Sequence, residues 1–117
     1  ILDRFWLFVQ HFIPVRLVDS DTLRVIQNLK DAHQIVMALT AREPLEVVYT
    51  KKQLDSVGLS LNNTVFAEKI LLGDSLYEQG VLYCGDRSKS EALMAFFQET
   101  QSYPKKVIFV DLILHNS

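Results

Sequence analysis

Three residues of this chain have the types and positions that phosphate chemistry requires. Thr40 ends the apolar run IVMALT, Lys89 stands where a helix is expected to begin, and Asp111 ends the apolar run VIFVD. A hydroxyl can donate to a phosphate oxygen, and a lysine neutralises phosphate charge and helps to keep a nearby carboxylate ionised. An aspartate offers an oxygen ligand to Mg²⁺, which takes only one or two protein carboxylates. Each residue alone is weak evidence, but together, in this order, they indicate a Mg²⁺-dependent phosphate site.

The strands and helices that would position these residues alternate along the chain. Residues 35–40 and 105–112 are largely continuous apolar runs, which suit strands buried on both faces of a parallel sheet. Strands that alternate with helices of this length predict an α/β fold with a mostly parallel sheet flanked by helices. In such a sheet the carboxyl ends of the strands carry the chemistry, and this rule selects Thr40 with Arg42, the turn 85–89 and Asp111.

The helix signals are local. Leu23, Ile26 and Leu29 follow helical spacing up to about His33, and Ser88 with Glu91 forms a capping box at the start of another helix. The remaining elements expected are a helix over 1–13, an extended stretch over 14–18, and a helix from Pro44 to Val57 with Gly58 as its C-cap. FAEKILL and GVLYC read as strands around the turn-forming GDSLYEQG, with a longer loop there as the alternative.

The composition indicates one globular α/β domain over residues 1–117, because 49% of the residues are hydrophobic and 22% are charged. The net charge is −2 without a long run of one sign, so no nucleic-acid partner is expected. A single cysteine, Cys84, excludes an internal disulfide and a cysteine-rich zinc site. The opening stretch 1–13 is too short and too charged to span a bilayer and lacks a signal-peptide layout. The sequence indicates no compartment.

The segments IVMALTAR, GDRSKSEALMAFF and PKKVIFVD resemble successive parts of the haloacid dehalogenase (HAD) superfamily. The resemblance covers roughly residues 14–117 and is closest to an uncharacterised bacterial branch whose motifs read ALTAR and IFVDD. It implies a HAD-like Rossmannoid fold in which Thr40 binds phosphate and Lys89 contacts both the phosphate and the nucleophile. It also implies that Asp111 ligates Mg²⁺, and that Arg42 lies at the rim, where it would meet substrate.

Two departures from this family pattern affect the expected chemistry. Leu112 stands where the family has a second acid, which should weaken Mg²⁺ binding. The central strand with the aspartate nucleophile is not found upstream of Thr40, and the predicted helix 1–13 would belong to a cap or insertion region. The stretch VDSDTL does not supply the nucleophile, because Thr22 follows Asp19 by three residues where the family spacing is four. Asp19, Ser20 and Asp21 are better explained as helix N-cap candidates.

The sequence therefore predicts a partial or degenerate HAD-like, Mg²⁺-dependent phosphohydrolase that is inactive without its nucleophile and whose ligand is a phosphorylated small molecule. The alternative is a non-catalytic module of the same fold that binds a ligand or a protein. A response-regulator-like domain ranks last, because it needs an acidic cluster and a phosphoacceptor strand before the threonine. Loss of the central strand would expose two apolar strand edges, which predicts oligomerisation or strand exchange.

Overall fold

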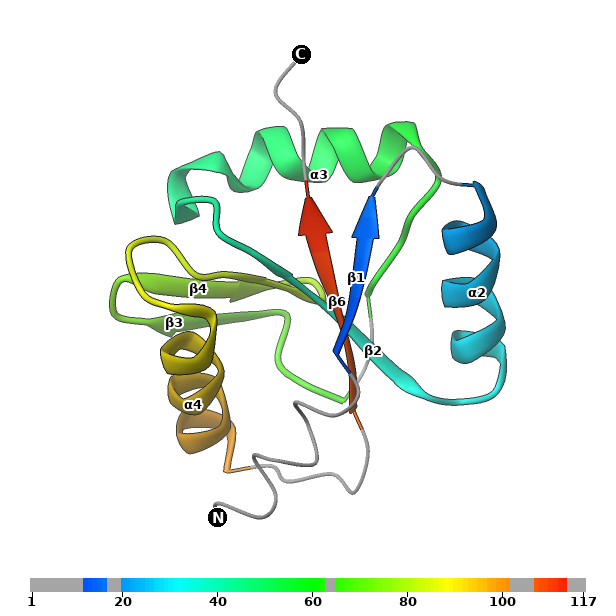
Figure 1. Cartoon of the computed structure of the whole chain (residues 1–117). Helices are drawn as coiled ribbons and strands as arrows, with labels where there is room; N and C mark the ends of the chain where they lie inside the picture. The colour runs from blue at the N-terminus through cyan, green and yellow to red at the C-terminus, as the bar shows by residue number, and fades with distance from the viewer. Residues whose placement is uncertain (1–11, 17–19, 63–64, 102–106, 114–117) are drawn as a thin grey trace.

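A six-stranded mixed sheet forms the centre of the computed structural model, which describes residues 12–16, 20–62, 65–101 and 107–113 (Figure 1). The strands lie in the order β1-β6-β2-β5-β4-β3. Their bounds are β1 Phe12–Arg16, β2 Ile35–Thr40, β3 Lys69–Leu72, β4 Ser75–Glu78, β5 Val81–Tyr83 and β6 Val107–Ile113. The pairs β1–β6, β6–β2 and β2–β5 are parallel, and β5–β4 and β4–β3 are antiparallel. The predicted α/β class with flanking helices is confirmed, and the sheet is mixed.

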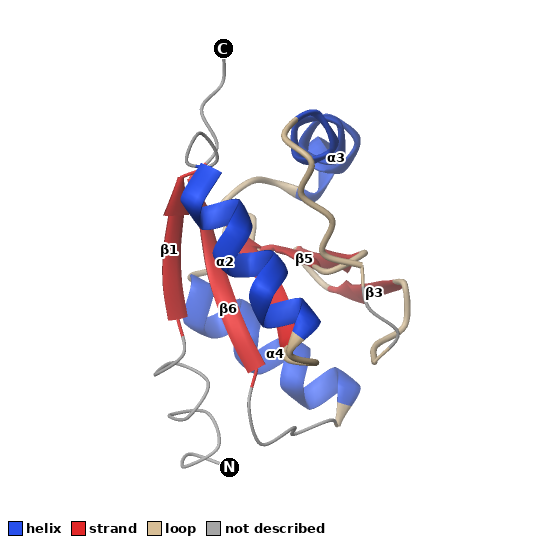
Figure 2. Cartoon of the chain, turned by 90° about the vertical axis from the view of Figure 1, so that its right-hand side faces the viewer, coloured by secondary structure: helices blue, strands red, loops and turns tan. Residues whose placement is uncertain are grey.

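The helices cover both faces of this sheet. They are α2 Ser20–Asp31, the short 3-10 helix η1 Pro44–Glu46, α3 Val47–Ser56 and α4 Lys89–Thr100. Ile26 of α2 and Leu54 of α3 pack in one hydrophobic cluster with Val36, Ala38 and Val110 of the sheet. The buried side chains of α4 pack in a second cluster with Met37, Leu39 and Phe109, which belong to the opposite face. Figure 2 shows the same separation, with β3 and β5 lying between α3 and α4.

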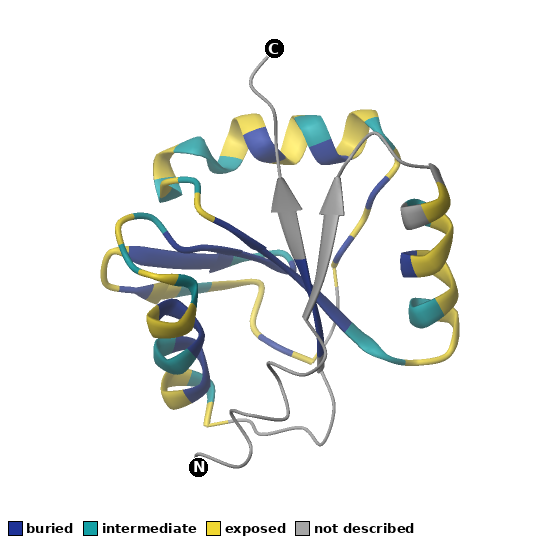
Figure 3. Cartoon of the chain, viewed as in Figure 1, coloured by how far each residue is buried: buried dark blue, intermediate teal, exposed yellow. Residues whose placement is uncertain are grey.

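Strand β2 contains the longest run of buried residues among the strands whose burial the structure describes. Its residues from Val36 to Thr40 are all buried, and they alternate between the two clusters (Figure 3). Parallel partners on both sides explain this burial, because β2 pairs with β6 through Met37↔Phe109 and with β5 through Leu39↔Leu82. The continuous apolar run at 35–40 predicted a strand of this kind, and that prediction is confirmed.

Several predicted boundaries are confirmed by the local chemistry of the helix ends. The backbone N–H of Glu91 donates to the Ser88 hydroxyl at 3.1 Å, which is the expected N-cap of α4. The second predicted helix begins as a 3-10 turn at Pro44 and continues as α3. The C-cap residue of α3 is Val57, one residue before the predicted C-cap Gly58, which follows with φ +76°.

The stretch GDSLYEQG is not a single turn, as the sequence suggested. It contains strand β4 with a tight turn on each side, at Gly73–Asp74 and at Gln79–Gly80. Gln79 and Gly80 have φ values of +49° and +87°, the sign that two-residue hairpin turns matching strand twist require. The segment between the turns has only four residues, too few for an alternation of apolar and polar side chains to indicate a strand.

The N-terminal prediction is wrong where the structure describes it. Phe12 and Ile13 belong to β1, which pairs in parallel with β6, and not to a helix over 1–13. Residues 1–11 of that prediction lie outside the described residues. The extended stretch predicted after Pro14 agrees with β1 as far as Arg16. Of the N-cap candidates, Ser20 and Asp21 lie inside α2, and Asp19 is not among the described residues.

The expected gap at the centre of the sheet does not exist. Strands β2 and β6 pair directly with each other from Ile35↔Val107 to Leu39↔Asp111, so no third strand separates them. Strand β1 lies on the other side of β6. The physical reason given for oligomerisation or strand exchange, two apolar edges left without a shared neighbour, therefore disappears.

Candidate functional site

The carboxyl ends of β2 and β5 meet at one edge of the sheet, as predicted for Thr40 and the turn 85–89. The backbone N–H of Cys84 donates to the carbonyl of Thr40 at 2.9 Å, and that of Gly85 donates to the carbonyl of Arg42 at 3.1 Å. These bonds continue the β2–β5 ladder beyond the strands and hold the two segments together. The segments that follow β2 and β5 are therefore adjacent, as predicted. Whether they can bind phosphate depends on their side chains.

Thr40 and Arg42 both have partners inside the fold. Thr40 is only 2% exposed, and its hydroxyl accepts a hydrogen bond from the Arg42 backbone N–H at 3.2 Å. The Arg42 guanidinium turns back to α3, where Nη1 donates to the Thr50 hydroxyl at 3.0 Å and Cζ lies 5.2 Å from the centroid of the Tyr49 ring. Both side chains thus stabilise the junction between β2 and α3.

Negative charge gathers at the same edge. The charge of Asp86 raises the pKa of Glu43 most strongly, followed by desolvation, a hydrogen bond between the two carboxyl groups, and the charges of Glu46 and Asp74. Gly85, with φ +63°, permits this approach, because a Cβ there would lie 2.8 Å from the Asp74 carbonyl oxygen and 3.2 Å from Glu43 Oε2. These carboxylates disfavour a bare phosphate directly beside Glu43.

Of the other two predicted residues, Lys89 begins a helix as expected, whereas Asp111 lies inside its strand. Lys89 is the first residue of α4, directly after the N-cap Ser88, at the end of the turn that follows β5. Asp111 is not at the end of its strand, because β6 continues to Ile113 and Asp111 pairs with Leu39 and Pro14. The structure describes the backbone of Asp111 and not its side chain. Within the described ranges, no group of three His, Cys, Asp or Glu residues is arranged to hold a metal ion.

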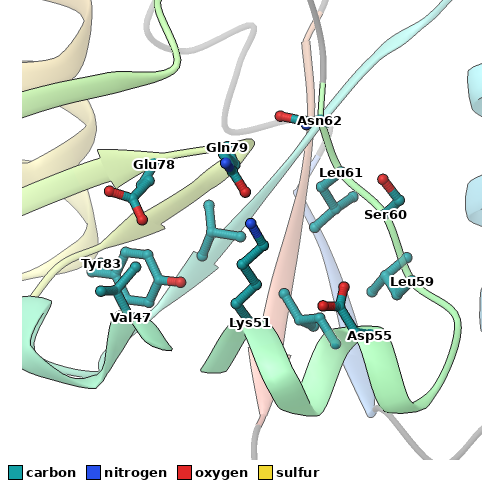
Figure 4. Close-up of a pocket in the computed structure, with 12 residues that line it drawn as sticks. Val47, Lys51, Asp55, Leu59, Ser60, Leu61, Asn62, Glu78, Gln79 and Tyr83 are labelled. Carbon is teal, nitrogen blue, oxygen red and sulfur yellow. The ribbon is translucent and has the colours of Figure 1, made fainter. Parts of the chain in front are cut away.

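A cleft that the sequence did not predict lies on the α3 face of the sheet (Figure 4). It has a volume of about 240 Å³ and lies between α3, the segment 59–62 and the turn that joins β4 to β5. Buried Leu54, Leu59, Leu61 and Val81 line it. The ammonium of Lys30 on α2 donates to the Ser60 carbonyl and so ties the segment 59–62 to its neighbour.

Charged groups of both signs surround this apolar lining. Lys51 and Asp55 come from successive turns of α3, and Glu78 comes from the end of β4. In Figure 4 the Lys51 ammonium extends over the cleft toward Gln79 and away from Asp55. The two ion pairs between described residues are Arg24–Asp21 and Lys69–Glu78, so the Lys51 ammonium forms none with another described residue.

Tyr83, which is only 2% exposed, lines the end of the cleft near Glu78. Burial, and then the charge of Glu78, raises the pKa of Tyr83 to about 12, against smaller lowering effects of Arg42 and of a hydrogen bond with Thr50. The phenol therefore stays protonated at neutral pH and can donate a hydrogen bond. Thr50 is completely buried, and its hydroxyl accepts from Arg42 on its other side. The predicted residue Arg42 thus supports the cleft through Thr50.

The sequence contained only a weak signal for this cleft. Lys51 and Asp55 are four residues apart, which places them on one side of a helix, but such pairs are common on solvated helix faces. The sequence predicts no element for residues 59–62, and it predicts one turn or a longer loop over GDSLYEQG, where the structure has two turns around β4.

The fold and the cleft define an α/β domain with a mixed sheet and a small surface cleft of mixed charge. The model of the family described as "Protein of unknown function (DUF2608)" matches residues 2–116, so the chain belongs to this family. No solved structure matches it. The helices in the described ranges are all too short or too polar to cross a membrane.

Two chlamydial relatives match most of the chain. A protein of Chlamydia pneumoniae is 27% identical over 108 residues, which is 92% of this chain and 41% of the relative. A protein of Chlamydia trachomatis is 24% identical over 106 residues, which is 91% of this chain and 41% of the relative. The names of both describe them as candidate outer membrane proteins. The chain thus spans about two fifths of the length of these relatives.

These matches correct the family resemblance inferred from the sequence. The ALTAR and VIFVD segments predicted a HAD-superfamily member, whereas the family that matches is DUF2608 and the matching relatives are chlamydial proteins of another description. The prediction was wrong because short strand-end motifs of apolar residues followed by one polar residue recur in many α/β domains.

Proposed function

We propose that this domain is a non-catalytic binding module that holds a small polar ligand in the cleft between α3 and the β4–β5 turn. The observation that carries the proposal is the arrangement of Lys51 over a lining of buried leucines, with the Tyr83 hydroxyl at one end. Ligand sites are typically concave, apolar in their lining, and provided with a few polar groups that fix the orientation of the ligand.

The partners of the strand-end residues support a binding role over a catalytic one. The Thr40 hydroxyl and the Arg42 guanidinium bond to neighbouring groups of the fold, and acids surround the turn that precedes α4. A catalytic phosphate site would need these donors aimed outward at a common point. At the cleft, by contrast, a charged ammonium extends over an apolar surface, an arrangement that favours a ligand with a charged group.

The test is a fragment screen by ¹H–¹⁵N NMR on the wild-type domain and two lysine variants. Lys51→Met keeps the length of the side chain and removes its charge, while Lys52→Met makes the same change at an exposed neighbour that does not line the cleft. We expect charged fragments to shift the amide signals of residues 59–62 and 78–83 in wild type and in Lys52→Met, and to shift them much less in Lys51→Met. Equal binding by both variants would show that Lys51 does not contact the ligand and would refute the proposal.

A second candidate function is phosphate-ester chemistry by a longer protein that contains this domain. The observation in its favour is that Thr40, the turn 85–88 and Lys89 share one edge of the sheet, the usual place for such chemistry. Among the described residues, no group of three His, Cys, Asp or Glu residues could hold the expected Mg²⁺ ion, and the side chain of Asp111 is not part of that set. Calorimetric titration with inorganic phosphate, with and without Mg²⁺, separates the two candidates: binding that Lys89→Ala abolishes would favour this one.

A further inference from the structure

The charges around the cleft follow an order along its length. Tyr83 and Glu78 lie at one end, Lys51 extends over the middle, and Asp55 lies at the other end beside Leu59 (Figure 4). Lys69 forms an ion pair with Glu78 at 3.8 Å, which offsets part of the Glu78 charge. Asp55 forms no ion pair with another described residue, since the described pairs are Arg24–Asp21 and Lys69–Glu78.

The lining between these groups is apolar. Leu54, Leu59 and Leu61 line the cleft and are each about 5% exposed or less. In Figure 4 Leu61 lies across the cleft from Lys51, and Leu59 lies beside Asp55. A ligand that bridges the two charges must therefore cover hydrocarbon surface on the way. Burial of such surface is favourable by about 25 cal/mol per Å², whereas a hydroxylated linker would lose hydrogen bonds to water there.

From this order we infer that the cleft takes a linear zwitterion: its carboxylate binds the Lys51 ammonium and the Tyr83 hydroxyl, its methylene chain covers the leucines, and its ammonium binds Asp55. This inference rests on the proposed function and adds the chemical class of the ligand. A simple carboxylate would leave Asp55 unpaired, and a simple amine would meet the Lys51 charge. Only a ligand with both charges satisfies both groups.

At neutral pH the Tyr83 phenol is protonated and can donate a hydrogen bond to a carboxylate. The negative charge of Glu78 repels the carboxylate of the ligand, so removal of that charge should strengthen binding. Glu78→Gln should tighten the binding of a carboxylate at this end of the cleft, whereas Asp55→Asn should weaken the binding of the ammonium at the other end.

The experiment compares 6-aminohexanoate, hexanoate and hexylamine as probes, by NMR titration of the domain. We expect 6-aminohexanoate to bind roughly tenfold more tightly than either singly charged probe, the ratio that one added charged hydrogen bond gives. Asp55→Asn should remove that advantage and leave hexanoate binding unchanged. Lys51→Met should weaken 6-aminohexanoate and hexanoate alike, and Lys52→Met should weaken neither.

The outcomes separate this inference from the proposed function. If hexanoate or hexylamine binds in the cleft as tightly as 6-aminohexanoate, the cleft is a ligand site but the zwitterion assignment is wrong. If Asp55→Asn leaves the advantage of 6-aminohexanoate intact, the assignment is wrong as well. If none of the probes shifts the signals of the cleft residues while the Lys51-dependent fragment binding persists, the inference fails alone; if that binding is also absent, both fail.

Discussion

Gly80 fixes one wall of the cleft, and its replacement should cost more stability than replacement of any of the other three glycines. Its φ is +87°, and a Cβ there would lie 1.9 Å from the carbonyl oxygen of Leu61 and 2.8 Å from the Leu61 Cβ. The backbone conformation alone costs an L-residue about 1–2 kcal/mol, and forced displacement of packed atoms adds about 1–3 kcal/mol. We therefore expect Gly80→Ala to lower the free energy of unfolding by roughly 2–5 kcal/mol.

Gly58 provides the matched control for this prediction. Its φ of +76° is of the same kind, but a Cβ there would have no atom within 4 Å. Gly58→Ala should therefore cost only the backbone strain, about 1–2 kcal/mol. Urea unfolding followed by circular dichroism measures both values. Equal losses in the two variants would show that contact with Leu61 is not what Gly80 provides, and the reasoning about this wall of the cleft would be wrong.

Three further predictions concern the caps, the phenol and the acids. Ser88→Ala should destabilise the protein by about 1 kcal/mol, because the N-cap bond to Glu91 is lost; Ser90→Ala, at an exposed site, is the control in the same urea assay. The phenol of Tyr83 ionises near pH 12 in the folded protein and near pH 10 when unfolded. Stability should therefore fall between pH 10 and 12, by about 2–3 kcal/mol in all, and Tyr83→Phe should flatten that part of the profile. Asp86→Asn should lower the pKa of Glu43, measured by carboxyl ¹³C titration, because the main cause of its rise is removed; an unchanged pKa would show that another group raises it.

Elements with a strong local signal could be predicted from the sequence. The strand 35–40 has six residues without a charge, and α4 begins at a capping box that its own residues form. Both signals need no information about distant parts of the chain. Strand β4 and strand β1 were missed or misassigned, because four residues between two glycine turns and five residues around Pro14 acquire their structure only from their neighbours in the sheet. Tertiary context overrides local preference in such short segments.

In the candidate site, too, local sequence patterns did not determine the contacts of the side chains. The sequence placed Thr40, Arg42 and Lys89 near one edge by the rule for parallel strands, but the rule says nothing about where a side chain turns. Arg42 turns toward α3 because Thr50 offers a buried acceptor there and Tyr49 offers a ring face. Asp111 was expected at the edge because it ends an apolar run, yet β6 continues two residues beyond it with Leu112 and Ile113.

Thr50 connects Arg42, which the sequence assigned to a phosphate site, with the cleft beside α3. It is a fully buried hydroxyl on a helix whose outer face is exposed, and burial of an unpaired hydroxyl is costly. Its partners are Arg42, which comes from the end of β2, and Tyr83, which comes from β5 and lines the cleft. The Arg42 guanidinium thereby fixes the orientation of the Thr50 hydroxyl, which contacts the Tyr83 phenol. A change at Arg42 should for this reason alter the titration of Tyr83 and ligand binding in the cleft, without any contact between Arg42 and the ligand.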